Sequence, residues 1–151
     1  MKIKAVVIPG HGVASGQGND PRYPEGTLKA QYEHFQKRGL DLLQYFTGTV
    51  NVDISPYSFR IRQPKYFFEN IQWSDHIPPE NFYFFDVALQ FNGEVYEGLI
   101  YMPDPATKED HFQEPTTLEL LLPKIDNVSY GDSALINVKE EQLELVEATT
   151  S

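Results

Sequence analysis

Thr49 and Asn51 are the residues whose types and spacing most clearly suggest chemistry. They lie two positions apart in an apolar, strand-like run from Phe46 to Ile54, and residues two apart in a strand face the same side. Gly48 precedes them, at a position where a backbone can bend or be approached closely. Two adjacent neutral oxygen ligands suit Mg²⁺, a hard cation that is commonly shared with substrate phosphates. The alternative is a half-buried strand whose polar face is exposed to solvent.

A glycine-rich segment near the N-terminus is a second candidate for binding. It runs from Gly10 to Asp20 with the sequence GHGVASGQGND and follows an apolar strand predicted over Ile3–Ile8. Backbone N–H groups in such a loop can turn toward an anion. The Lys-Ser/Thr ending of a Walker sequence is missing after Gly16, and the glycine spacing does not fit a dinucleotide fingerprint. The segment therefore predicts either an anion-binding loop of another kind or an ordinary surface turn.

Length and composition limit the possible classes of protein. The 151 residues fit a single domain that buries about two-thirds of the surface exposed by its unfolded chain. The absence of cysteine excludes disulfides, thiolate metal sites and cysteine nucleophiles. The four histidines have no paired ligand spacing, so no zinc site is predicted. Neither a signal peptide nor a run of roughly 20 apolar residues is present. We therefore expect a soluble, cytoplasmic protein without a membrane partner.

The charge balance separates two kinds of nucleotide ligand. A formal net charge of −10 argues against binding a nucleic acid polymer, because that affinity comes largely from Lys and Arg neutralising many phosphates. A mononucleotide carries few charges, and these can be met locally by a metal ion, a glycine loop and one or two cations.

One helix and many short strands are predicted. The helix spans Glu25–Arg38, with Leu28, Tyr32 and Phe35 at helical spacing, and Gly39 ends it. Asn92-Gly93 between two apolar runs is a strong hairpin signal. Long irregular connections are expected over residues 64–79 and 103–115. Besides residues 3–8, strands are predicted over residues 49–54, 57–62, 82–91, 94–102, 117–122, 133–138 and 142–146.

This pattern predicts a mainly β protein, a small β-barrel with one principal helix. We expect one domain over residues 1–147 and a frayed tail over residues 148–151. Asp86 directly follows the aromatic run Phe82–Phe85 inside a predicted strand. It is either a buried acid paired with another group or a sign that one face of this strand is exposed to solvent.

Several short motifs occur in an order that points to a known family. They are Gly12–Gly18 (GVASGQG), Tyr32 with Phe35, Gly48–Val52 (GTVNV), Leu118–Pro123 (LELLLP) and Gly131-Asp132. In these motifs the chain resembles the archaeal-type CTP-dependent riboflavin kinases, a family of cradle-loop β-barrels. The resemblance extends over most of the chain and implies a six-stranded barrel of the cradle-loop type.

The resemblance also implies an activity and a set of site residues. The reaction would be Mg²⁺-dependent phosphoryl transfer from CTP, or another NTP, to the 5′-hydroxyl of riboflavin, giving FMN and CDP. Thr49 and Asn51 fall on the family's Mg²⁺ ligands, and Glu119 falls on a flavin-contacting residue. His111 stands where the family has a flavin-contacting Thr. The nucleotide-binding positions correspond to Gly16, Gln17, Gly18, Asn19, Lys124, Ile125, Asp126 and Asn127.

Two departures from the family keep other functions open. The segment Pro103–Asp110 is more acidic than the family's loop, and the turn Asp20–Gly26 is longer. The alternatives are a non-catalytic domain that binds a small ligand or nucleotide on the same barrel and, least favoured by the acidic charge, a DNA-binding regulator. For transfer to riboflavin, Glu119 and His111 must lie within about 10 Å of Thr49 and Asn51.

Overall fold

The computed structural model describes residues 2–8, 27–41, 50–73, 78–104, 116–125 and 128–147, without the side chains of residues 27–30 and 32. The predicted tail at residues 148–151 lies outside these ranges. No helix among the described residues is long and apolar enough to cross a membrane. The elements are β1 (Lys2–Ile8), α1 (Thr27–Lys37), β2 (Val50–Asp53), β3 (Tyr57–Ile61), β4 (Tyr66–Ile71), β5 (Glu80–Phe91), β6 (Glu94–Pro103), β7 (Thr117–Leu121), β8 (Ser133–Val138) and β9 (Leu143–Glu147).

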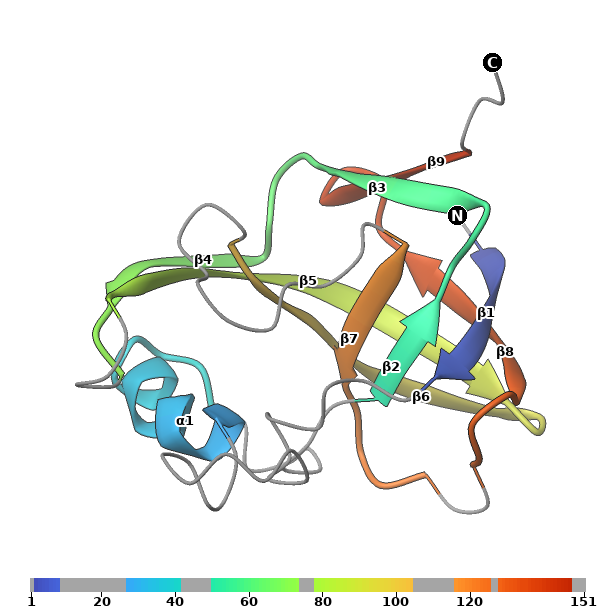
Figure 1. The fold of residues 1–151 in the computed structure, drawn as a ribbon, viewed down its shortest axis with the longest axis horizontal. Coiled ribbons are helices and arrows are strands. Elements are labelled where there is room, and N and C mark those ends of the chain that lie inside the picture. Colours follow the sequence, from blue (N-terminus) through green and yellow to red (C-terminus); the bar gives the residue numbers. More distant parts are fainter. Residues whose placement is uncertain are drawn as a thin grey trace.

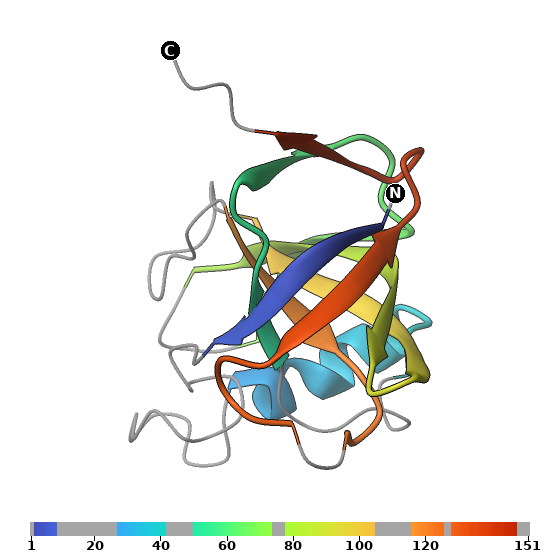
Figure 2. The same ribbon diagram turned by 90° about the vertical axis from the view of Figure 1, so that its right-hand side faces the viewer.

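Six antiparallel strands close into a barrel in the order β5, β6, β7, β2, β1, β8 and back to β5 (Figures 1 and 2). β4 pairs with β5 outside this ring, while β3 and β9 form a separate two-stranded ribbon. This architecture confirms the predicted mainly β fold with a small six-stranded barrel. Within the described ranges, α1 is the one helix.

The predicted hairpin turn between β5 and β6 and the predicted end of the helix at Gly39 are both confirmed. Asn92 and Gly93 have φ values of 51° and 78°, the left-handed conformation that a two-residue hairpin turn of type I′ requires. Gly39 ends α1 with φ 98°. The amides of Gly39 and Leu40 donate to the carbonyls of Gln36 and Phe35, which is the hydrogen-bond pattern of a Schellman motif.

The prediction of an irregular connection over residues 64–79 is wrong for the part that forms β4. The prolines at positions 64, 78 and 79 lie outside this strand, so they bound it without interrupting its hydrogen-bond ladder. Phe68 and Ile71 of β4 are buried. A register shift separates them, and Asn70 between them has φ 54°. The bulge hides the simple two-residue alternation that marks most strands.

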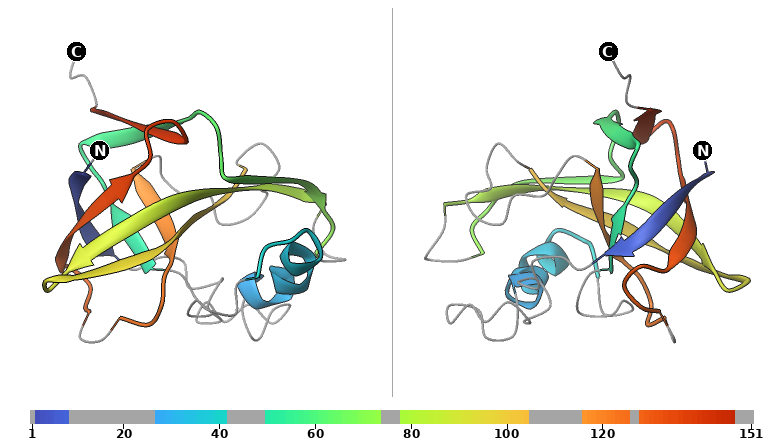
Figure 3. Two further views of the ribbon diagram at one scale, coloured as in Figure 1. Left: turned by 180° about the vertical axis from the view of Figure 1, so that it is seen from behind. Right: turned by 45° about the vertical axis from the view of Figure 1, so that its right-hand side comes forward.

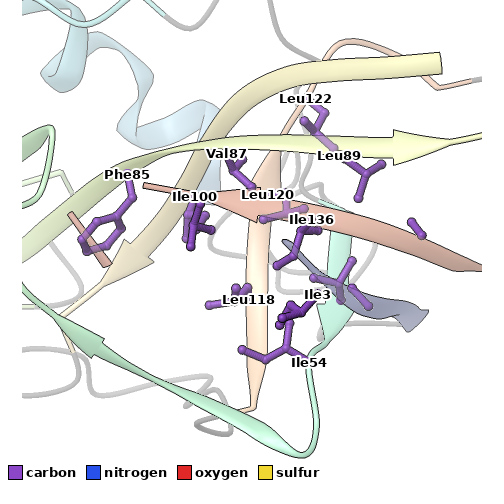
Figure 4. Close-up of a cluster of buried hydrophobic side chains, with 14 of the residues drawn as sticks. Ile3, Ile54, Phe85, Val87, Leu89, Ile100, Leu118, Leu120, Leu122 and Ile136 are labelled. Carbon is purple, nitrogen blue, oxygen red and sulfur yellow. The ribbon is translucent and has the colours of Figure 1, made fainter. Parts of the chain in front are cut away.

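The interior of the barrel holds the larger of two hydrophobic cores. Alternate residues of the barrel strands point inward, where their side chains are fully or almost fully buried (Figure 4). β6 and β7 approach closely, because a Cβ added at Gly98 would lie 2.0 Å from the Leu121 carbonyl oxygen. The residues labelled in Figure 4 are Ile3, Ile54, Phe85, Val87, Leu89, Ile100, Leu118, Leu120, Leu122 and Ile136.

A second core lies between α1 and the outer face of β4, β5 and β6, which extend beyond the barrel (Figure 3). Phe35 of α1 is completely buried there. Its ring meets Phe82 and Phe84 edge to face, with centroids 5.0 and 5.1 Å apart, and stacks at 5.9 Å on Phe68. These contacts hold the helix on the sheet.

Asp86 lies where one edge of β5 changes its partner. β4 pairs with β5 as far as Phe84, and β8 pairs with it from Val87 onward. The Asp86 amide therefore lies between the two ladders, and it donates to Gln142 Oε1 at 2.8 Å. Gln142 thus supplies the acceptor that a neighbouring strand would otherwise provide.

The Asp86 carboxylate is paired as well as partly buried. Its oxygens lie 2.9 Å from Lys65 Nζ and 3.3 Å from Lys139 Nζ, and Gln142 Nε2 donates to it at 2.9 Å. Partial burial alone would raise the pKa of Asp86, but the hydrogen bonds from Gln142, Lys65 and Lys139 outweigh it and lower the pKa. Asp86 is therefore paired, as one of the two readings of the sequence expected, but it is only partly buried.

We predict that Asp86→Asn lowers the free energy of unfolding by about 1 kcal/mol at pH 7, a modest value because both lysines are about half exposed. A lowered pKa means that the carboxylate stabilises the fold above its unfolded pKa of about 3.9 and loses this effect as the pH falls through the folded value. Urea unfolding at pH 7 and pH 3 should therefore show the difference between wild type and variant shrinking in acid.

The matched control is Glu144→Gln on β9. Glu144 meets Arg60 and Arg62 at 3.9 and 3.4 Å on the surface, where ion pairs contribute little. A loss for Glu144→Gln at pH 7 as large as that for Asp86→Asn would contradict a special role for the β5 junction.

Candidate functional site

Asn51 and Glu119 face each other across two neighbouring barrel strands. They are partners in the antiparallel register of β2 and β7, so their Cα atoms lie about 4.5–5.5 Å apart and their side chains share one face. Val52, Leu118 and Leu120 belong to the barrel core. Asn51 and Glu119 alternate with these residues and therefore project from the outer face of the barrel.

A row of polar groups continues from Glu119 toward the helix. Tyr101 of β6 is the register partner of Glu119 on the other side, and its hydroxyl donates to Gln31 Oε1 of α1 at 2.5 Å. Glu119, Tyr101 and Gln31 are all buried. Asn51, Glu119 and Tyr101 thus form a row across three strands, and Gln31 joins this row to α1. We call these four residues the polar row.

The electrostatics of the polar row are those of a buried site. Burial, followed by the carboxylates of Glu119 and Glu80, raises the pKa of Tyr101 well above its ordinary value. Glu80 is itself 4% exposed and Glu119 is 7% exposed. The phenol therefore stays protonated at neutral pH, and it donates its hydrogen bond to Gln31 Oε1.

Asn51 contributes a polar atom that the fold leaves unused. Its Oδ1 is buried and has no hydrogen-bond partner among the described residues. Such an atom lowers the stability of the folded state unless a ligand or ion satisfies it. A neutral amide oxygen beside the Glu119 carboxylate also suits the oxygen-ligand chemistry of Mg²⁺.

The structure places only part of the predicted site. It brings Asn51 and Glu119 together. Lys124 is exposed just after β7, while the Ile125 side chain packs in the barrel core. The other predicted site residues, which lie outside the described ranges, are Gly16, Gln17, Gly18, Asn19, Thr49, His111, Asp126 and Asn127.

Sequence reasoning missed Tyr101, Gln31 and Glu80. Gln31 lies four positions before Phe35, so helical spacing places both on the buried face of α1, and that spacing was the available signal. Glu80 carried none, because it begins β5 two residues before the strand predicted over residues 82–91. The buried hydrogen bond between Tyr101 and Gln31 joins residues 70 positions apart. Neither the sequence around Gln31 nor the sequence around Tyr101 indicates it.

Comparisons with known proteins identify no family. No family model matches the chain, and no curated protein matches it either. Within the described residues no group of three or more His, Cys, Asp or Glu side chains gathers to hold a metal ion. A magnesium site built from neutral oxygens, water and substrate phosphate needs no such group. What the molecule displays is thus a closed six-stranded barrel with the polar row on its outer face.

We predict that Asn51→Val raises the free energy of unfolding by about 1 kcal/mol in the ligand-free protein. The substitution removes an unsatisfied buried oxygen and places a β-branched residue in a strand. Chemical denaturation measures the change. The control is Ser133→Val at an exposed position of β8, which should change stability by less than about 0.5 kcal/mol. A clear loss of stability for Asn51→Val would mean that the fold itself uses this amide.

Proposed function

We propose that the protein is a Mg²⁺-dependent phosphotransferase that transfers a phosphoryl group from CTP to the 5′-hydroxyl of riboflavin. The observation that carries this proposal is the pairing of Asn51 with Glu119 on one face of a six-stranded barrel. The proposed metal ligand and the proposed acceptor contact come from motifs 68 positions apart in the sequence. Their adjacency in space is what a transfer reaction requires, because donor and acceptor must be aligned.

The proposal assigns complementary tasks to the two residues. Asn51 Oδ1, together with Thr49, would hold Mg²⁺, which when bound neutralises phosphate charge. The Glu119 carboxylate accepts hydrogen bonds only, so it suits the hydroxyl groups of a ribityl chain and orients the 5′-oxygen. Both residues border a hydrophobic core, where low polarity strengthens such interactions.

Nucleotide binding is assigned to two further segments. Gly16, Gln17, Gly18 and Asn19 would turn backbone N–H groups toward the phosphates of CTP. Lys124, exposed after β7, supplies a cation close in sequence to Glu119. Phosphoryl transfer asks the protein mainly for alignment and charge stabilisation, so these groups and the metal ion provide the chemistry that the reaction needs.

The direct test is to incubate the protein with riboflavin, Mg²⁺ and each NTP in turn, and to measure FMN by chromatography. We expect FMN with CTP as the preferred donor and none when EDTA removes the metal. Binding of CDP and CTP without FMN formation would favour the non-catalytic nucleotide-binding domain. If calorimetry detects no binding of either nucleotide at millimolar concentration, the assignment of the site is wrong.

Two substitutions separate the donor and acceptor sides. Asn51→Leu should abolish the Mg²⁺-dependent part of CDP binding, because it removes one of two protein ligands. Glu119→Gln should weaken riboflavin binding by about tenfold through the loss of charged hydrogen bonds and leave CDP affinity within about twofold. Calorimetry measures both, with Ser133→Leu on β8 as the control for Asn51→Leu. Equal nucleotide affinity in a folded Asn51→Leu variant would refute its role as a ligand.

A further inference from the structure

β4 is the last strand of the seven-stranded sheet, and no strand lies along its outer edge in the part of the chain that the structure describes (Figure 1). An uncovered edge presents backbone N–H and C=O groups that can pair with another chain. Phe67 of this strand is 40% exposed, and its ring stacks on Tyr83 of β5 with centroids 4.6 Å apart. β4 thus ends the sheet with an exposed aromatic side chain at an uncovered edge.

The ribbon of β3 and β9 also has uncovered edges among the described strands, but it is protected by charge. Arg60 and Arg62 form ion pairs with Glu144 of β9, whereas the apolar side chains of β3 pack against the barrel core. Charged side chains on an edge strand disfavour pairing with another chain. Within its described residues the ribbon has no exposed large hydrophobic side chain, unlike β4.

The protection of β4 itself lies only at its C-terminal end. A register shift there and the left-handed backbone of Asn70, with φ 54°, interrupt the regular ladder. The Arg38 guanidinium donates to the Glu69 carbonyl oxygen at 3.4 Å, again at this end. Before the bulge, the aromatic stretch Tyr66–Phe68 pairs with β5 in one continuous register. The aromatic stretch is therefore the part of the edge that is suited to pairing.

The residues around the aromatic stretch are symmetric in charge. Lys65 and Glu69 lie two positions before and after Phe67, and all three are exposed while Phe68 is buried. If a second copy of β4 runs antiparallel with Phe67 opposite Phe67, Lys65 of each copy lies opposite Glu69 of the other. Opposite charges across an antiparallel pair are stabilising, and like charges are destabilising. The strand is thus complementary to a second copy of itself.

The Glu69 charge lies close to the exposed aromatic pair. Burial, followed by the carboxylates of Asp104 and Glu69, raises the pKa of Tyr83, on which Phe67 stacks. Lys65 keeps its own ion pair with Asp86 at 2.9 Å, since the match between two strands depends on net attraction between charges and not on a vacant hydrogen bond. An aromatic centre with a charged rim is the usual composition of a protein interface.

We propose that β4 is a self-association surface, at which two copies of the chain pair their β4 strands antiparallel about a two-fold axis at Phe67. The pairing is isologous, so the same patch serves both copies, and it joins the two sheets into one. So short a strand pair buries less area than a standard interface, and we expect a weak dimer with a dissociation constant of about 100 µM. The proposed function of the barrel is not needed for this inference.

Analytical ultracentrifugation of the wild-type chain between about 1 µM and about 1 mM tests the association. We expect monomer at the low end and mostly dimer at the high end. Hydrogen exchange at the two ends of this range should show added protection over Tyr66–Phe68 and none in β3 or β9. Monomer at every concentration would overturn the proposal. A monomer that nevertheless binds a synthetic peptide of residues 64–70 would make a foreign strand the occupant instead of a second copy.

Two matched variants ask whether the association uses this edge. Phe67→Ser should weaken it by at least about tenfold, because the central aromatic contact is lost. Val95→Ser on β6 is the control, since Val95 is 62% exposed and this variant also removes an exposed apolar side chain. It should associate within about threefold of wild type. Equal weakening in the two variants would show that the dimer does not depend on β4.

Charge reversal tests the antiparallel register in a way that a loss of stability cannot imitate. Glu69→Lys places lysines opposite each other in a dimer of identical chains, and Lys65→Glu does the same with glutamates. Each variant alone should associate at least about tenfold more weakly than wild type. An equimolar mixture should regain association within about threefold of wild type, because lysine then faces glutamate at both rim positions.

The charge-reversal variants are measured at a temperature where both are folded. Asp86 keeps its contacts with Lys139 and Gln142 in the Lys65→Glu variant, so the junction on β5 retains two partners. A mixture of folded variants that stays monomeric would refute the pairing, as would wild-type association of Glu69→Lys alone. If Lys65→Glu does not fold, the results for Glu69→Lys and Phe67→Ser decide the question without it.

Discussion

The fold depends on the way in which one strand, β5, is shared among three neighbours. Its 12 residues pair with β6 along one edge, and with β4 and then β8 along the other. Pairing with β8 closes the barrel, whereas pairing with β4 extends the sheet beyond the barrel as a wing on which α1 packs. A closed ring removes the exposed edges of its strands, but the wing needs a cover for its apolar face. Phe35 supplies that cover from the helix.

The polar row lies at the border between the two cores created by this division. The aliphatic side chains of β2 and β7 face into the barrel, and the opposite face of β7 reaches the second core through Leu121. Asn51 and Glu119 are therefore polar groups in a largely apolar neighbourhood. Interactions with a charged ligand are strong in such surroundings, and unsatisfied groups are correspondingly destabilising. A binding site is a good physical reason for a fold to keep an unsatisfied oxygen there.

Local patterns in the sequence were enough to predict most of the fold. Short strand-like runs predicted eight of the strands, and Asn92-Gly93 marked the hairpin between β5 and β6. β4 was missed because its bulge at Asn70 breaks the alternation and because prolines lie on both sides. The motif resemblance selected Asn51 and Glu119, although periodicity alone gave no reason to pair them. Their register depends on how β2 and β7 meet in the barrel, and a linear sequence does not state such long-range pairings. The same limit applied to Gln31 and Tyr101.

The two cores also have a consequence for cooperativity. α1 and β4 contribute to the second core alone, so they can open as a unit while the ring of six strands stays closed. Amide hydrogens in α1 should then exchange with solvent through a smaller free energy of opening than those in β1 or β8. Because α1 carries Gln31, each opening would release the Tyr101 hydroxyl from its acceptor. Fluctuations of a helix that lies outside the barrel would in this way reach a buried tyrosine on a barrel strand.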